Sequence, residues 1–258
     1  MPSLFVTLSY YKIRMHHPKN IFACLSLSAI CLLASCGGPG ERIKEIAART
    51  PTPVATPTER EISGVFNVTG AGTNGIDPYN GVLTIAPQGD AYGFRWNTTS
   101  GSHNGVGVQM GDATAATYAN PGGGTGCGVV LYKIASDGSL DGRTAKWGED
   151  KFGMEKAIRI EGTGFVGKYN VTGMANDGKP YTGTLKITKD GGGYDFEWQT
   201  GGKTTVGFGI WKGSIAAASF GGHQCSFALY DIKSNGNMEG SWGGQKSVTF
   251  GTETAKRQ

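Results

Sequence analysis

Apolar and polar residues alternate along much of the chain in short runs, as in β-strands with one buried face. In GTLKITK (183–189), Leu185 and Ile187 fall on one side and Lys186 and Thr188 on the other. YDFEWQ (194–199) repeats the alternation with aromatic residues, and TVGFGIW (205–211) places glycines on the second face. No stretch of a dozen residues has a helical period, so the pattern predicts an all-β protein.

Asp-Gly and Asn-Gly pairs stand between these runs. Such pairs supply the positive φ angles that tight hairpin turns require, so they predict antiparallel strands joined in sequence. The pairs are Asn74-Gly75, Asp137-Gly138, Asp177-Gly178, Asp190-Gly191 and Asn235-Gly236.

The chain contains an internal duplication. GVFNVTG (64–70) returns as GKYNVTG (167–173), YGFRW (92–96) as YDFEW (194–198), and LYKI (131–134) as LYDI (229–232). FGME (152–155) returns as FGTE (250–253), in the same order. The sequence therefore divides into a first repeat, 62–162, and a second repeat, 163–258, and each is predicted to form its own antiparallel domain.

Each repeat is long enough for about eight short strands. Such a meander hides its edges by closing into an up-and-down barrel or by folding into a β-sandwich. The barrel is favoured because consecutive hairpins need no long crossover. The glycine-aromatic strands are loosely similar to avidin- and lipocalin-like barrels, and both repeats resemble Gly-rich β-repeats of exported proteobacterial proteins. Some of those proteins are labelled fibronectin-binding, but the resemblance implies no particular function here.

The N-terminal segment 1–35 is predicted to be a signal peptide. Its apolar run IFACLSLSAICLL (21–33) is too short to span a bilayer. The following Leu33-Ala34-Ser35-Cys36 resembles the lipobox of bacterial lipoproteins, which implies cleavage before Cys36 and a diacylglycerol anchor on its thiol. Glycines rather than aspartate follow Cys36, which by the same resemblance implies the outer membrane. A start at Met15 would give a more compact signal.

Residues 36–61 are predicted to be a linker that holds the folded part away from the membrane. They include RTPTPVATPTER (49–60), and proline-rich chain of this kind prefers an extended polyproline geometry.

The charge balance excludes a nucleic-acid partner. The whole chain has 24 basic and 20 acidic residues, and removal of Lys12, Arg14 and Lys19 with the signal peptide leaves 21 against 20. No stretch interleaves basic and aromatic residues in the manner of a nucleic-acid groove.

Motif searches predict neither a metal site nor a cofactor. After processing, the remaining histidines are His103 and His223, which lack ligand neighbours at metal-binding spacing and are not at equivalent repeat positions. GGKTT (201–205) lacks the earlier glycine of a phosphate loop, and no G-x-S-x-G motif occurs. The protein is therefore not expected to be an enzyme, although a site built from scattered residues remains an alternative.

The aromatic residues repeated in both copies are the candidate ligand-lining residues: Tyr92, Trp96, Tyr194 and Trp198. An eight-stranded barrel can hold one small ligand, and the alternative is that these residues are plain core. The predicted function is a non-catalytic binding or interaction module of the envelope. Its partner would be a small hydrophobic ligand, a glycan or an envelope protein. A structural or assembly accessory without a small ligand is the alternative.

Cys127 and Cys225 occupy equivalent positions in the two repeats. Each precedes a strand that is apolar on both faces, at 128–134 and 226–232. Such a strand needs a second cover, and the matching strand of the other repeat would bring the cysteines together. An exported compartment permits a disulfide, but two separately buried thiols fit the sequence equally.

Overall fold

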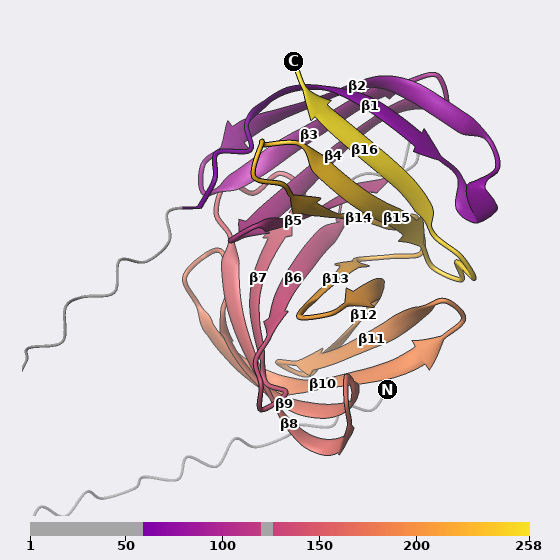
Figure 1. Ribbon diagram of the computed structural model, residues 1–258. Helices are drawn as coiled ribbons and strands as arrows, with labels where there is room; N and C mark the ends of the chain where they lie inside the picture. Colours follow the sequence, from indigo (N-terminus) through magenta and orange to yellow (C-terminus); the bar gives the residue numbers. More distant parts are fainter. Residues whose placement is uncertain (1–58, 120–125) are drawn as a thin grey trace, which may run out of the picture. The chain divides into compact units, whose positions relative to one another are not determined.

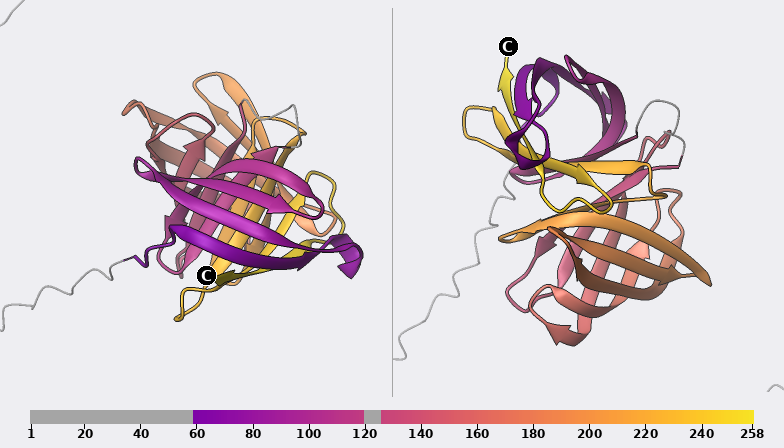
Figure 2. Two further views of the ribbon diagram at one scale, coloured as in Figure 1. Left: turned by 90° about the horizontal axis from the view of Figure 1, so that it is seen from above. Right: turned by 90° about the vertical axis from the view of Figure 1, so that its right-hand side faces the viewer.

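The computed structural model describes residues 59–119 and 126–258, which fold into two closed antiparallel barrels of eight strands each (Figures 1 and 2). Both barrels belong to one compact unit. The described residues contain no α-helix, and one turn of 3-10 helix, η1 (Thr73–Gly75), follows the first strand. The predicted all-β class and the barrels are confirmed, and the sandwich alternative is excluded.

Each barrel is a ring of neighbouring antiparallel strands. Barrel 1 consists of β1 (Gly64–Ala71), β2 (Pro78–Gln88), β3 (Ala91–Thr98), β4 (Gly101–Met110), β5 (Ala113–Ala119), β14 (Cys225–Ile232), β15 (Met238–Gly244) and β16 (Gly251–Arg257). Barrel 2 consists of β6 (Gly128–Ile134), β7 (Leu140–Lys146), β8 (Gly153–Thr163), β9 (Val166–Met174), β10 (Pro180–Asp190), β11 (Gly193–Thr200), β12 (Lys203–Lys212) and β13 (Ile215–Phe220). The predicted turn glycines all have positive φ: Gly75, Gly138, Gly178, Gly191 and Gly236.

The two repeats exchange their last three strands. In barrel 1, β1–β5 come from the first repeat and β14–β16 from the second, so yellow strands complete a purple barrel in Figures 1 and 2. Barrel 2 combines β6–β8 of the first repeat with β9–β13 of the second. The chain crosses between the barrels after β5 and again after β13. The expectation that repeat 62–162 and repeat 163–258 each close their own barrel is therefore wrong.

The exchange has a physical reason in the equivalence of the repeats. β5 pairs with β14, with Ala116 opposite Ala228, and β13 pairs with β6, with Ala218 opposite Val130. A repeat that closed on itself would pair β5 with β6 through residues of the same kind. Domain swapping, in which identical elements trade places, therefore preserves the strand pairing of each barrel.

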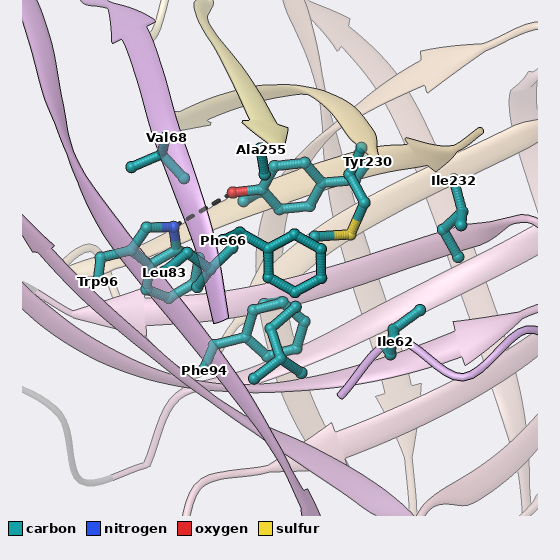
Figure 3. Close-up of a cluster of buried hydrophobic side chains, with 13 residues drawn as sticks. Ile62, Phe66, Val68, Leu83, Phe94, Trp96, Tyr230, Ile232 and Ala255 are labelled. Atoms are coloured by element: carbon teal, nitrogen blue, oxygen red, sulfur yellow. Dashed lines mark hydrogen bonds between the residues drawn. The ribbon is translucent and has the colours of Figure 1, made fainter. Parts of the chain in front are cut away.

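Each barrel has its own apolar interior. The interior of barrel 1 runs from Ile62 to Trp96, which lie at opposite sides of the cluster in Figure 3. Phe165 and Trp198 belong to the corresponding cluster of barrel 2. Ile62 and Phe165 both precede the first strand of their repeat and are almost fully buried, at 1% and 3% exposure.

A third apolar cluster joins the two barrels. It includes Val129 and Leu131 of β6 together with Phe227 and Leu229 of β14. The alternate residues of the same strands, such as Val130 and Ala228, belong to the barrel interiors. These strands are therefore buried on both faces. As inferred from the sequence, the residues that cover the second face include those of the matching strand in the other repeat.

Cys127 and Cys225 form a disulfide in the structure, with their Cα atoms 5.5 Å apart. Both are buried and share a small cluster with Ala119, at the end of β5. Cys127 precedes β6 and Cys225 begins β14, so the bond links the two places where the chain crosses between barrels.

The predicted signal peptide, Cys36 and most of the predicted linker lie outside the described residues. The last residues of the predicted linker, 59–61, are described, and they have no regular secondary structure. Glu59 forms an ion pair with Arg143 at 3.0 Å, and Arg60 pairs with Asp112 at 2.9 Å. Among the described residues, no helix has the length and apolar character needed to cross a membrane.

Candidate ligand-binding pockets

Each barrel contains a cavity with a buried glutamate in its wall. Pocket 1, in barrel 1, has a volume of about 430 Å³, and pocket 2, in barrel 2, about 400 Å³. The main lining residues of pocket 1 are Tyr79, Trp96, Tyr118, Tyr230, Trp242 and Glu253. Those of pocket 2 are Tyr181, Trp198, Phe220, Glu155, Lys146 and Lys203.

In pocket 1, three donors converge on the carboxylate of Glu253. The hydroxyl of Tyr230 donates to Oε1 at 2.6 Å, and the hydroxyl of Tyr79 donates to Oε2 at 2.8 Å. The indole Nε1 of Trp96 lies 3.2 Å from Oε1 and 3.2 Å from the Tyr230 oxygen, the contact drawn in Figure 3. Glu253 is only 5% exposed, and these bonds compensate for much of the cost of burying it.

Pocket 2 repeats this cluster residue by residue. Glu155 accepts hydrogen bonds from Tyr132, from Tyr181 at 2.9 Å and from the Trp198 indole at 3.2 Å. Because of the strand exchange, each cluster contains residues from both repeats. Tyr132 and Glu155 come from the first repeat, whereas Tyr181 and Trp198 come from the second.

Glycines on neighbouring strands make room for the aromatic rings of the cluster. A Cβ atom at Gly70 would lie 2.3 Å from the Tyr79 ring, and one at Gly173 would lie 2.3 Å from the Tyr181 ring. These glycines end the two copies of the phrase Asn-Val-Thr-Gly. The repeated glycine therefore allows each tyrosine to lie against its strand and reach the buried glutamate.

Burial dominates the electrostatics of both clusters. It raises the pKa of Glu253 and of Glu155 above the ordinary value, although the three hydrogen bonds to each carboxylate act in the opposite direction. Burial, followed by the charge of the adjacent glutamate, also raises the pKa of Tyr79 and Tyr230. The tyrosines therefore remain protonated and donate their hydrogen bonds across the physiological pH range.

Two residues that line pocket 1 each have a ring nitrogen buried within the protein. Within the described ranges, neither Nδ1 of His103 nor Nε1 of Trp242 has a hydrogen-bond partner, although both atoms are buried. His103 contacts Tyr118, with ring centroids 5.4 Å apart, and makes no hydrogen bond to a described serine or carboxylate. The serine–histidine–acid arrangement of a nucleophilic enzyme is thus not formed by the described residues.

Half of the aromatic residues chosen from the sequence line the pockets. Trp96 and Trp198 do so, whereas Tyr92 and Tyr194 line neither pocket. Each tyrosine shares a strand face with its tryptophan but precedes it by four residues, about 13 Å along a strand. Tyr194 accordingly packs against Phe165, with ring centroids 5.1 Å apart.

The glutamates and the remaining tyrosines were missed by reasoning from sequence. Their signal was present in the repeated FGME and FGTE, which place a glutamate on the inward face of a strand at Glu155 and Glu253. A carboxylate repeated at a buried position indicates a shared polar cluster.

No group of three or more His, Cys, Asp and Glu side chains in the described part of the chain is arranged to hold a metal ion. Comparison of the chain with protein-family models, with curated proteins and with solved structures finds no match.

Proposed function

We propose that this chain is a lipid-anchored protein of the bacterial envelope that binds a small ligand in its barrel pockets and catalyses no reaction. The observation that supports binding is pocket 1, with its volume of about 430 Å³, aromatic walls and buried Glu253. Cavities of roughly 300–1,000 Å³ with mainly apolar walls and a few placed polar groups are typical of small-molecule sites.

An amphipathic ligand fits this pocket better than a purely hydrophobic one. Five aromatic rings offer apolar contact area. A ligand without polar atoms, however, would offer no partner to Glu253, whose Oε2 receives one hydrogen bond while its Oε1 receives two. A glycan, an envelope protein, or a structural role without a ligand are the competing hypotheses.

The absence of catalysis is supported by the character of the lining groups. Each cluster has one carboxylate, and its three bonded neighbours all donate hydrogen bonds to it. General acid–base catalysis by a pair of carboxylates would need a second acidic group, and the described lining of each pocket contains one.

The anchor is proposed at Cys36, behind the apolar run of the signal peptide. A Cys36→Ala variant should lose incorporated palmitate and leave the membrane fraction. Cys31→Ala, within the same apolar run, is the matched control and should remain anchored. Normal processing and membrane association of Cys36→Ala would contradict the anchor.

Ligand binding is tested by filling each pocket in turn. Thr98 lines pocket 1 and its equivalent Thr200 lines pocket 2, so Thr98→Phe and Thr200→Phe form a matched pair. Ligand-observed NMR with a panel of small cationic, anionic and neutral amphiphiles should detect binding that one of these variants removes and the other retains. If no compound binds, or if binding survives in both variants, the pockets are not ligand sites.

A further inference from the structure

The two pockets have the same polar cluster but different surroundings, and this difference indicates the kind of ligand. Strand registers identify the equivalent positions, because Trp96 lies opposite His103 as Trp198 lies opposite Thr205. By the same comparison of β15 with β7, Trp242 of pocket 1 corresponds to Thr144 of pocket 2. The duplication has therefore kept the buried glutamate while changing what a ligand would meet beside it.

Pocket 1 is aromatic and lacks lysine or arginine among its described lining residues. The rings lie close together, with centroids 5.5 Å apart for Trp96 and Tyr118 and 6.2 Å apart for Tyr79 and Trp242. Aromatic faces attract cations within about 6 Å of the ring centroid, and tryptophan does so best.

Pocket 2 has the opposite charge character. Lys146 and Lys203 both line it, whereas the corresponding strand positions of barrel 1 are Gly244 and Gly101. It also has Thr144 in place of the second tryptophan. Two lysines beside one glutamate disfavour a cationic ligand, so pocket 2 is a control within the same chain.

The carboxylate of Glu253 has one unused acceptor site, so its hydrogen bonds do not fully compensate its negative charge. A carboxylate offers about four acceptor sites, and Glu253 receives three hydrogen bonds, of which only that from Tyr79 reaches Oε2.

From these features, and building on the proposed ligand-binding function, we infer that pocket 1 binds an organic ammonium ion. The aromatic rings and the charge of Glu253 bind the cation. Pocket 2 does not bind this class of ligand.

The probe that tests this inference is choline, with 3,3-dimethyl-1-butanol as its uncharged isostere of the same shape. Isothermal titration of the intact protein should show one choline site per chain, with an affinity at least ten times that for the isostere. Glu253→Gln, which keeps the shape of the side chain but removes its charge, should reduce this preference. Glu155→Gln, the same change in pocket 2, should leave it unchanged.

A second variant covers the case in which Glu253→Gln does not fold. Trp242→Thr gives pocket 1 the residue that pocket 2 has, and it should weaken choline binding about tenfold, equivalent to about 1.4 kcal/mol. Circular dichroism confirms folding of each variant.

The outcomes separate this inference from the proposed function. Equal affinity for choline and for its isostere would refute the cation preference and leave small-ligand binding intact. Choline binding that responds to Glu155→Gln but not to Glu253→Gln would also overturn the inference. A further outcome is that choline fails to bind, while another class of compound in the NMR panel binds and loses that binding in Thr98→Phe. That result would refute the cation preference and support ligand binding in pocket 1.

Discussion

The disulfide between Cys127 and Cys225 should contribute a large part of the stability of the fold. The bond joins residues 98 apart in sequence. In the chain-entropy model, closure of a loop of that length stabilises the folded state by about 4–5 kcal/mol, because it removes conformations from the unfolded chain. Since domains are typically stable by only about 5–15 kcal/mol, the double variant Cys127→Ala/Cys225→Ala should lose between about a third and nearly all of that stability.

Urea unfolding followed by circular dichroism measures this effect. The double variant should show a lower free energy of unfolding and a steeper dependence on urea, because its unfolded chain is more expanded. Alanine is preferred to serine because both positions are almost fully buried. A decrease in the free energy of unfolding below about 1 kcal/mol, within the range of ordinary substitutions, would show that the disulfide does not stabilise the fold to this extent. Labelling of both thiols by an alkylating agent in the denatured, unreduced protein would refute the bond itself.

Three further predictions concern the polar clusters and the exchange. Burial raises the pKa of Glu155 and Glu253 above the ordinary value of 4.5. The stability that these glutamates contribute is therefore present below pH 4.5 and is lost as the pH rises through their folded-state pKa. In urea titrations above pH 4.5 the free energy of unfolding should fall for the original protein, and this fall should be absent from the Glu155→Gln/Glu253→Gln variant. Gly70→Ala should destabilise the protein by about 1–3 kcal/mol in the same assay by displacing Tyr79, and an unchanged midpoint would contradict the close contact. The fragment Thr163–Gln258 should form a strand-exchanged homodimer in light scattering, because β13 and β14 pair with strands of the other repeat, and a stable monomer would contradict this expectation.

The strands and turns were predictable because their signals are local. Alternation in 183–189 and 194–199 depends on neighbouring residues only, and each Asp-Gly or Asn-Gly pair sets its own turn. The second cover for β6 and β14 was also predictable, because a strand with two apolar faces cannot leave either face in water.

The strand exchange was not predictable from these patterns. Ala116 has an equivalent partner available in either repeat, Val130 or Ala228, and the exchanged and unexchanged barrels make the same kind of pair. The choice depends on the path of the chain between the barrels, and a comparison of the two repeats gives no information about that path.

The pockets were predictable only in part. Trp96 belongs to a conspicuous aromatic run and was identified, but Glu253 comes from a strand 157 residues further along the chain. Its role depends on a closed barrel that brings β3, β2, β14 and β16 around one cavity. Since the barrel is completed by the other repeat, the assignment of one barrel to each repeat also hid the composition of the site.

Both barrels, and hence both pockets, are built from strands of both repeats. Cross-strand Hα–Hα nuclear Overhauser effects in the full chain test this arrangement, because opposed Cα atoms in antiparallel strands lie about 4.5–5.5 Å apart. The exchanged fold predicts contacts between β5 and β14 around Ala116 and Ala228, and between β13 and β6 around Ala218 and Val130. Contacts between β5 and β6 around Ala116 and Val130 would instead show that each repeat closes on itself, without strand exchange.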